Sequence, residues 1–131
     1  MYYFEKDYIM RLIHGIAQVL ARLLLGIEME GEGELLLLRD KAARDQNDLL
    51  RRMIDEGRVN AAEERLFDLL ENTGWDDHEK AALTLLFYDY LNEKNDEFLA
   101  AADFSREEII RGMEDALRIA NMEIPEYLRI D

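Results

Sequence analysis

The sequence predicts an all-α protein, a compact bundle of five to six helices, and three observations support this fold class. Only one proline and seven glycines interrupt the 131 residues. Apolar residues recur at three- and four-residue intervals in successive stretches of the chain. No segment alternates between apolar and polar residues over the length of a strand. The length fits one domain, which we expect to span residues 1–131.

The first predicted helix spans Asp7 to Leu25 and is apolar around most of its circumference. At about 100° per residue, its polar side chains fall within an arc of about 80°. These side chains are Asp7, Arg11, His14, Gln18 and Arg22. A helix with so narrow a polar stripe must be surrounded by other helices or shared with a second chain. Gly26 is expected to end it.

An acidic loop and a long helix are expected next. The loop, residues 28–34, contains two glycines and the acids Glu28, Glu30, Glu32 and Glu34. The helix is predicted from Leu35 to Glu56, either as one helix or as two that divide at the polar residues 45–48. Gly57 follows it, at the place where a left-handed cap would end the helix.

The third helix is predicted from Val59 to Glu71. Asn60 and Glu63 have the spacing of a capping box, in which each side chain bonds the other residue's backbone N–H. Gly74 is expected to close this helix.

The fourth helix begins with Asp76 and Glu79, which have the same cap spacing, and runs to Asn92. Its centre, residues 81–91, is apolar almost all round. We therefore expect this helix to be deeply packed.

A short helix within Lys94–Asp103 and a long one over Arg106–Asn121 complete the prediction. Ser105 and Glu108 form the clearest capping box in the sequence, and they place the start of the last helix.

Composition and charge exclude several classes of protein. Hydrophobic residues make up 49% of the chain, which rules out a disordered acidic tail. The net charge of −14 repels nucleic-acid phosphates and anionic lipid, so we expect neither as a partner. The stretch from Tyr8 to Ile27 has about the length of a membrane span, but Arg11 and Arg22 interrupt it. A cytoplasmic protein is the expectation.

The sequence offers little chemistry for catalysis or metal binding. Cysteine is absent, which removes disulfides, thiolate zinc sites and a cysteine nucleophile. Residues 76–79 are three acids and a histidine, but they point in different directions at a helix start, where they serve as caps. The acidic loop could hold calcium weakly, although it lacks the spacing of an EF-hand. We expect no metal and no cofactor, and an enzyme is not the favoured class. One low-ranking polar site is retained, made of Arg11, His14 and Gln18, which are one helical turn apart.

Two segments resemble known families. Residues 49–70, with Gly57-Arg58-Val59-Asn60-Ala61-Ala62 at the turn, resemble one tetratricopeptide helical hairpin, which implies a tetratricopeptide-like pair within the bundle. Phe4-Glu5-Lys6-Asp7-Tyr8-Ile9-Met10-Arg11-Leu12-Ile13 is similar to the opening of a family of small acidic bacterial proteins of unknown function. That resemblance implies an intracellular helical protein and supplies no active site.

Three classes of function stay open on the sequence alone. The leading hypothesis is a helical protein–protein interaction module, expected to form a homodimer through the apolar face of the first helix. We assign that face to Tyr8, Leu12, Ile16, Leu20 and Leu24. The second hypothesis is an acidic mimic of nucleic acid that occupies a basic site on another protein. The third is a small-ligand carrier or enzyme with a pocket between helices, where His14, Arg11 and Tyr8 would supply polar groups.

Overall fold

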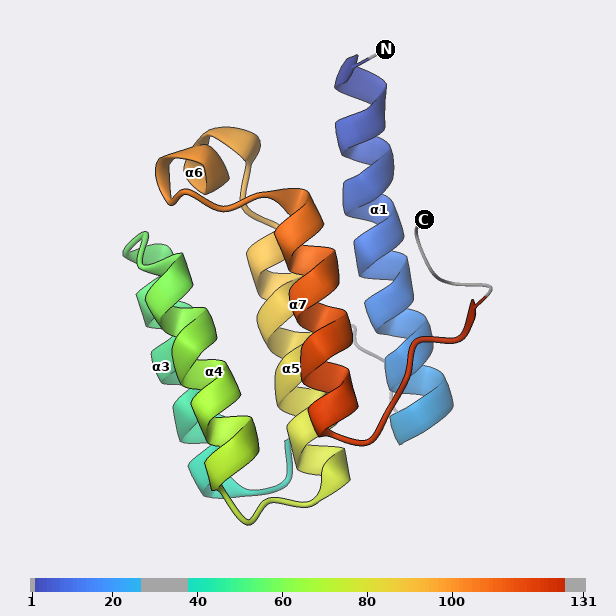
Figure 1. Cartoon of the computed structure of the whole chain (residues 1–131), viewed down its shortest axis with the longest axis vertical. Coiled ribbons are helices and arrows are strands. Elements are labelled where there is room, and N and C mark those ends of the chain that lie inside the picture. Colours follow the sequence, from blue (N-terminus) through green and yellow to red (C-terminus); the bar gives the residue numbers. More distant parts are fainter. Residues whose placement is uncertain (1, 27–37, 127–131) are drawn as a thin grey trace.

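The computed structural model describes residues 2–26 and 38–126; of residues 2–7, 24 and 25 it describes the backbone only. The described chain is helical throughout its regular structure and contains no strand, which confirms the all-α prediction (Figure 1). The elements are α1 (Tyr2–Leu20), the π-helical turn η1 (Ala21–Leu25), α3 (Lys41–Asp55), α4 (Val59–Asn72), α5 (Asp77–Asn92), α6 (Asp96–Ala101) and α7 (Arg106–Ile119). None of these helices combines the length and the apolar content needed to cross a bilayer.

Helix α5 is the central element of the bundle. It packs against α7, α3 and α1, and in Figure 1 the α5/α7 pair stands between the α3/α4 hairpin and α1. Apolar side chains on all sides of α5 are buried, among them Leu83, Leu86, Phe87 and Tyr88. The sequence predicted this deep packing, because residues 81–91 offer no polar face to water.

The α3/α4 hairpin turns at Gly57, which has a φ of 83°. Its N–H bonds Ile54 O at 2.8 Å, and the N–H of Arg58 bonds Met53 O at 2.9 Å, so the last carbonyls of α3 are satisfied. Helix α3 is continuous through residues 45–48, so the division considered there does not occur. Gly26, with a φ of 69°, ends η1 as expected.

The start of α3 differs from the prediction. The described chain is not helical at residues 38–40, and Asp40 caps α3 by accepting the N–H of Ala42 at 2.7 Å. The prediction began this helix at Leu35, and residues 35–37 lie outside the described chain. Hydrogen bonds from the backbone N–H groups of Arg39 and Asp40 to Glu79 on α5 hold this segment extended.

Of the three predicted N-terminal caps, those at Ser105 and Asp76 are present and the one at Asn60 is not. The capping box of Ser105 and Glu108 is present in both directions. Asp76 caps α5 by accepting the N–H of Glu79. The predicted box of Asn60 and Glu63 is wrong, because Arg58 occupies the N-cap and no side chain caps α4. Partners distant in the sequence engage both side chains: Asn60 donates to Ala102 O, and Glu63 accepts from the Tyr88 hydroxyl.

Helix α1 lies at the edge of the bundle. Its N-terminal end reaches past α7 in Figure 1. One side is buried against α5, through Ile13, Ile16, Ala17 and Leu20. Among the described residues α5 is enclosed, whereas α1 is buried along one side, although both helices are apolar around most of their circumference.

Candidate functional site

The outward side of α1 and η1 carries exposed apolar side chains. Among the side chains that the structure describes, the large exposed apolar ones are Tyr8 and Leu23, each at 59%. Leu12 and Val19 lie between them and are half-buried. At about 100° per residue, these four residues fall within about 60° of one another. We call this set, Tyr8, Leu12, Val19 and Leu23, the outer seam.

The structure divides the interaction face predicted from the sequence. Tyr8 is exposed and Leu12 is half-buried. Ile16 and Leu20 are buried against the chain's own core, so they are not available to a partner in this arrangement. The side chain of Leu24 lies outside the described residues. Sequence reasoning missed Val19 and Leu23 as surface residues, because a helix that is apolar on several sides does not reveal which side faces its own bundle.

A pocket of about 380 Å³ lies beside the outer seam, between α1 and the C-terminal end of α5. The predicted polar site lines it on one side, through Arg11, His14 and Gln18. Met10 and Gly15 complete the α1 wall, and Asn92 and Glu93 line the pocket from α5. The structure therefore brings the three predicted polar residues together, as their spacing of one turn requires.

His14 is held by an acid that the sequence analysis did not single out. Its Nδ1 lies 2.6 Å from Asp89 Oδ1 on α5. Asp89 is only 7% exposed, and His14 is half-buried at the pocket. A carboxylate accepts hydrogen bonds, so Nδ1–H is the donor and Nε2 is the ring nitrogen left for a further partner.

A second polar contact joins α1 to α5 one turn from the first. Asn92, almost fully buried, donates from Nδ2 to Met10 O at 2.8 Å. The guanidinium of Arg106 donates to Asn92 O at 2.6 Å and to Asn92 Oδ1 at 3.0 Å. Arg106 also donates to Lys94 O and Asp96 Oδ1, which ties α6 to the start of α7. Burial lowers the pKa of Arg106, and the neighbouring Asp96 carboxylate opposes this effect.

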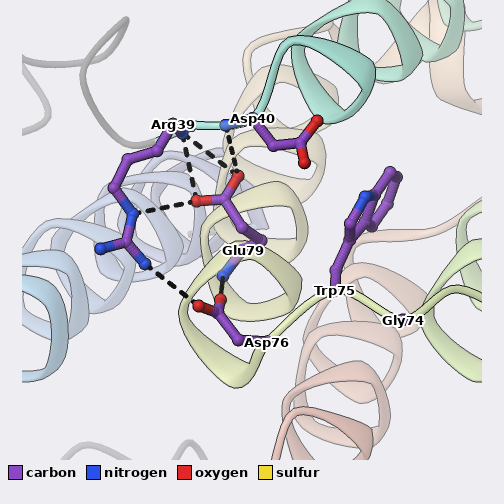
Figure 2. Close-up of a pocket in the computed structure, with 6 residues that line it drawn as sticks. All are labelled: Arg39, Asp40, Gly74, Trp75, Asp76 and Glu79. Atoms are coloured by element: carbon purple, nitrogen blue, oxygen red, sulfur yellow. Dashed lines mark hydrogen bonds and ion pairs between the residues drawn. The ribbon is translucent and has the colours of Figure 1, made fainter.

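Figure 2 shows another pocket, of about 470 Å³, at the start of α5. Its central group is the Glu79 carboxylate, which accepts the backbone N–H groups of Arg39 and Asp40 at 3.1–3.2 Å and the Arg39 Nε at 3.3 Å. Trp75 stands across the pocket and packs against the core. The chain itself uses the polar groups here, so this hollow fastens the 38–40 segment to α5 and offers few groups to a ligand.

A buried pair lies on the far side of α5. The Tyr88 hydroxyl donates to Glu63 Oε2 at 2.7 Å, beneath Gly112 of α7. Burial raises the pKa of Glu63 above its ordinary 4.5, and the hydrogen bond from Tyr88 partly opposes this rise. Burial also raises the pKa of Tyr88, so the phenol stays protonated.

The capping role expected for residues 76–79 holds for Asp76, whereas Asp77 and Glu79 bond residues distant in the sequence. Asp76 caps the helix, and Asp77 accepts from Asn121 Nδ2 at 3.2 Å. Across the part of the chain that the structure describes, no three His, Asp or Glu side chains converge as metal ligands would. Glu28, Glu30, Glu32 and Glu34, considered for calcium, lie outside that part.

These features define a small acidic helical bundle with one half-covered helix and a polar pocket beside it. A family model described as a family of unknown function (DUF6483) matches residues 3–121, and the chain belongs to this family. No curated protein and no solved structure matches the chain. The resemblance to a family of unknown function is thereby confirmed, whereas the likeness of residues 49–70 to a tetratricopeptide hairpin gains no further support.

Proposed function

We propose that the protein is a helical interaction module that binds through the outer seam of α1, with a second copy of the chain as a partner. The observation that carries this proposal is the location of Tyr8 and Leu23, the exposed large apolar side chains of the described part, on one side of one helical stretch. A monomer gains nothing from exposing them, and covering apolar surface contributes about 25 cal/mol per Å².

The seam lies in a stretch of the sequence that contains no acidic residue. The chain carries −14 overall, yet no Asp or Glu occurs from Tyr8 to Gly26, where Arg11 and Arg22 are both exposed. The stretch itself therefore adds no negative charge to a contact between two acidic chains, although Asp89 and Glu93 lie beside it.

Light scattering on the purified chain tests the proposal. A homodimer has twice the 15.4 kDa mass of the chain at micromolar concentration. Leu23→Glu should reduce that mass to the monomer value, because it places a charge within the apolar contact. Ala61→Glu is the matched control, since it adds the same charge to an exposed position on α4 and should leave the dimer intact. A monomer at every concentration tested would reject self-association.

A second candidate function is favoured by the pocket at His14. A small-ligand carrier needs a pocket with convergent polar groups, and this open pocket of about 380 Å³ offers Arg11, His14 and Gln18 on one wall. A guanidinium and an imidazole together suit a carboxylate. Titration with acetate, followed through the His14 ring signals by NMR, tests this function. The shifts should saturate, and they should vanish in Arg11→Leu; no shift at millimolar acetate would argue against a carboxylate carrier.

The acidic-mimic hypothesis has weaker support. Several surface acids of the described chain pair with neighbouring bases, for example Lys41 with Asp45 at 3.0 Å and Arg118 with Asp115 at 2.6 Å. A mimic needs unpaired carboxylates at phosphate-like spacing, so we do not put it forward. The proposed setting of the module is the cytoplasm, as expected from the sequence.

A further inference from the structure

Gly15 lies in the middle of α1, at the edge of the His14 pocket, and no packing contact among the described residues requires a glycine there. A glycine inside a helix costs about 1 kcal/mol relative to alanine. Gly112, inside α7, is explained by its neighbours, because a Cβ there would collide with the Tyr88 hydroxyl and with Glu63 Oε2. At Gly15, apart from its own helix backbone, no described atom lies within 4 Å of the place of a Cβ. Among the described residues, alanine would therefore fit at position 15.

Gly15 sits beside the midpoint of the outer seam. Tyr8 and Leu23 are equally far along the sequence from the point between Gly15 and Ile16, and so are Leu12 and Val19. The seam is therefore symmetric about that point. A symmetric seam with a missing side chain at its centre is what two identical helices need to cross closely in opposite directions.

We propose that two copies of the chain associate by an antiparallel crossing of their α1 helices, centred at Gly15. This inference rests on the proposed function and assigns its geometry. In the crossing, Tyr8 packs against Leu23 of the partner subunit, and Leu12 packs against Val19 of the partner subunit. The glycine lets the two backbones approach at the centre, while the larger residues fill the space toward the ends.

The helix dipoles favour the antiparallel direction over the parallel one, because the two dipoles then point in opposite directions.

Single engineered cysteines test the crossing, because the chain contains no cysteine of its own. A disulfide needs two Cα atoms within about 7 Å. Gly15→Cys lies at the centre and should cross-link to its own copy under mild oxidation. Tyr8→Cys should not, because the two copies of residue 8 are about 22 Å apart in the antiparallel pair. A mixture of Tyr8→Cys and Leu23→Cys chains should form the mixed disulfide, and Ala61→Cys serves as a control for random collision.

Gly15→Leu supplies a second measurement. The added side chain fills the crossing point, so the dimer dissociation constant should rise about tenfold or more, while the helical content of the chain stays unchanged. A dimer in which Tyr8→Cys links to itself would overturn the antiparallel crossing but leave the interaction module standing. A dimer that Gly15→Leu does not weaken would overturn the role of the glycine. A chain that stays monomeric would overturn both the crossing and the proposed self-association.

Discussion

Replacing Gly112 with alanine tests the packing between α4, α5 and α7. Helix propensity alone predicts a gain of about 1 kcal/mol, because glycine is a poor helix former. The structure predicts the opposite, since the new Cβ meets the Tyr88 hydroxyl, the ring carbon that bears it and Glu63 Oε2. Tyr88 is fully buried, so its ring cannot move aside freely. Overpacking costs about 1–3 kcal/mol, and the loss of a hydrogen bond to a charged group costs about 1.5–3 kcal/mol. After the propensity gain, the net loss is about 1.5–5 kcal/mol.

Urea unfolding followed by circular dichroism measures this loss, and a double-mutant cycle locates its cause. Tyr88→Phe removes the hydroxyl and should itself cost about 1–3 kcal/mol, because Glu63 loses its buried donor. In the Tyr88→Phe background, Gly112→Ala should cost at least about 1 kcal/mol less than in the native chain, since one of the two closest obstacles is gone. A stabilised Gly112→Ala chain, or two costs that simply add, would refute the reasoning.

Three further predictions concern other groups. The pKa of Glu63 is raised in the folded chain, so its ionisation opposes folding at neutral pH and this penalty disappears as the pH falls toward the ordinary 4.5. The urea midpoint of the native chain relative to Glu63→Gln should therefore rise from pH 7 to about pH 5, and a constant difference would contradict this account. Ser105→Ala should cost about 1 kcal/mol in thermal unfolding, and Ser105→Asp should be nearly neutral; equal losses would contradict the cap. Glu79→Gln should cost about 1–3 kcal/mol and speed amide exchange at Arg39 and Asp40, whereas unchanged exchange would contradict the fastening contact.

Helix positions were largely predictable because they follow from local rules. The apolar periodicity placed α4, α5 and α7 within a few residues, and Gly57 and Ser105 marked ends that the structure confirms. The errors arose where a distant partner takes over a side chain. Asn60 and Glu63 have the spacing of a capping box, yet each engages another helix or loop.

The candidate site was predictable on one helix only. The spacing of Arg11, His14 and Gln18 places them on one side of α1, and all three line the pocket. The α5 residues that complete the site could not be assigned, because the spacing of residues along the sequence does not show that α1 packs against α5. Asp89 in particular lies within a stretch that the sequence describes as apolar, and its contact with His14 is not apparent from the sequence.

The two polar contacts between α1 and α5 have a consequence for how α1 can move. Packed helices can shift past one another by one turn where two arrangements are possible, and directional contacts then decide the axial position. The contacts of His14 with Asp89 and of Met10 O with Asn92 are directional and lie one turn apart, and a shift would break both. These two contacts therefore fix the position of α1 along its own axis. Arg106 donates hydrogen bonds to both Asn92 and Lys94, so the position of α1 is coupled to the segment that leads into α6.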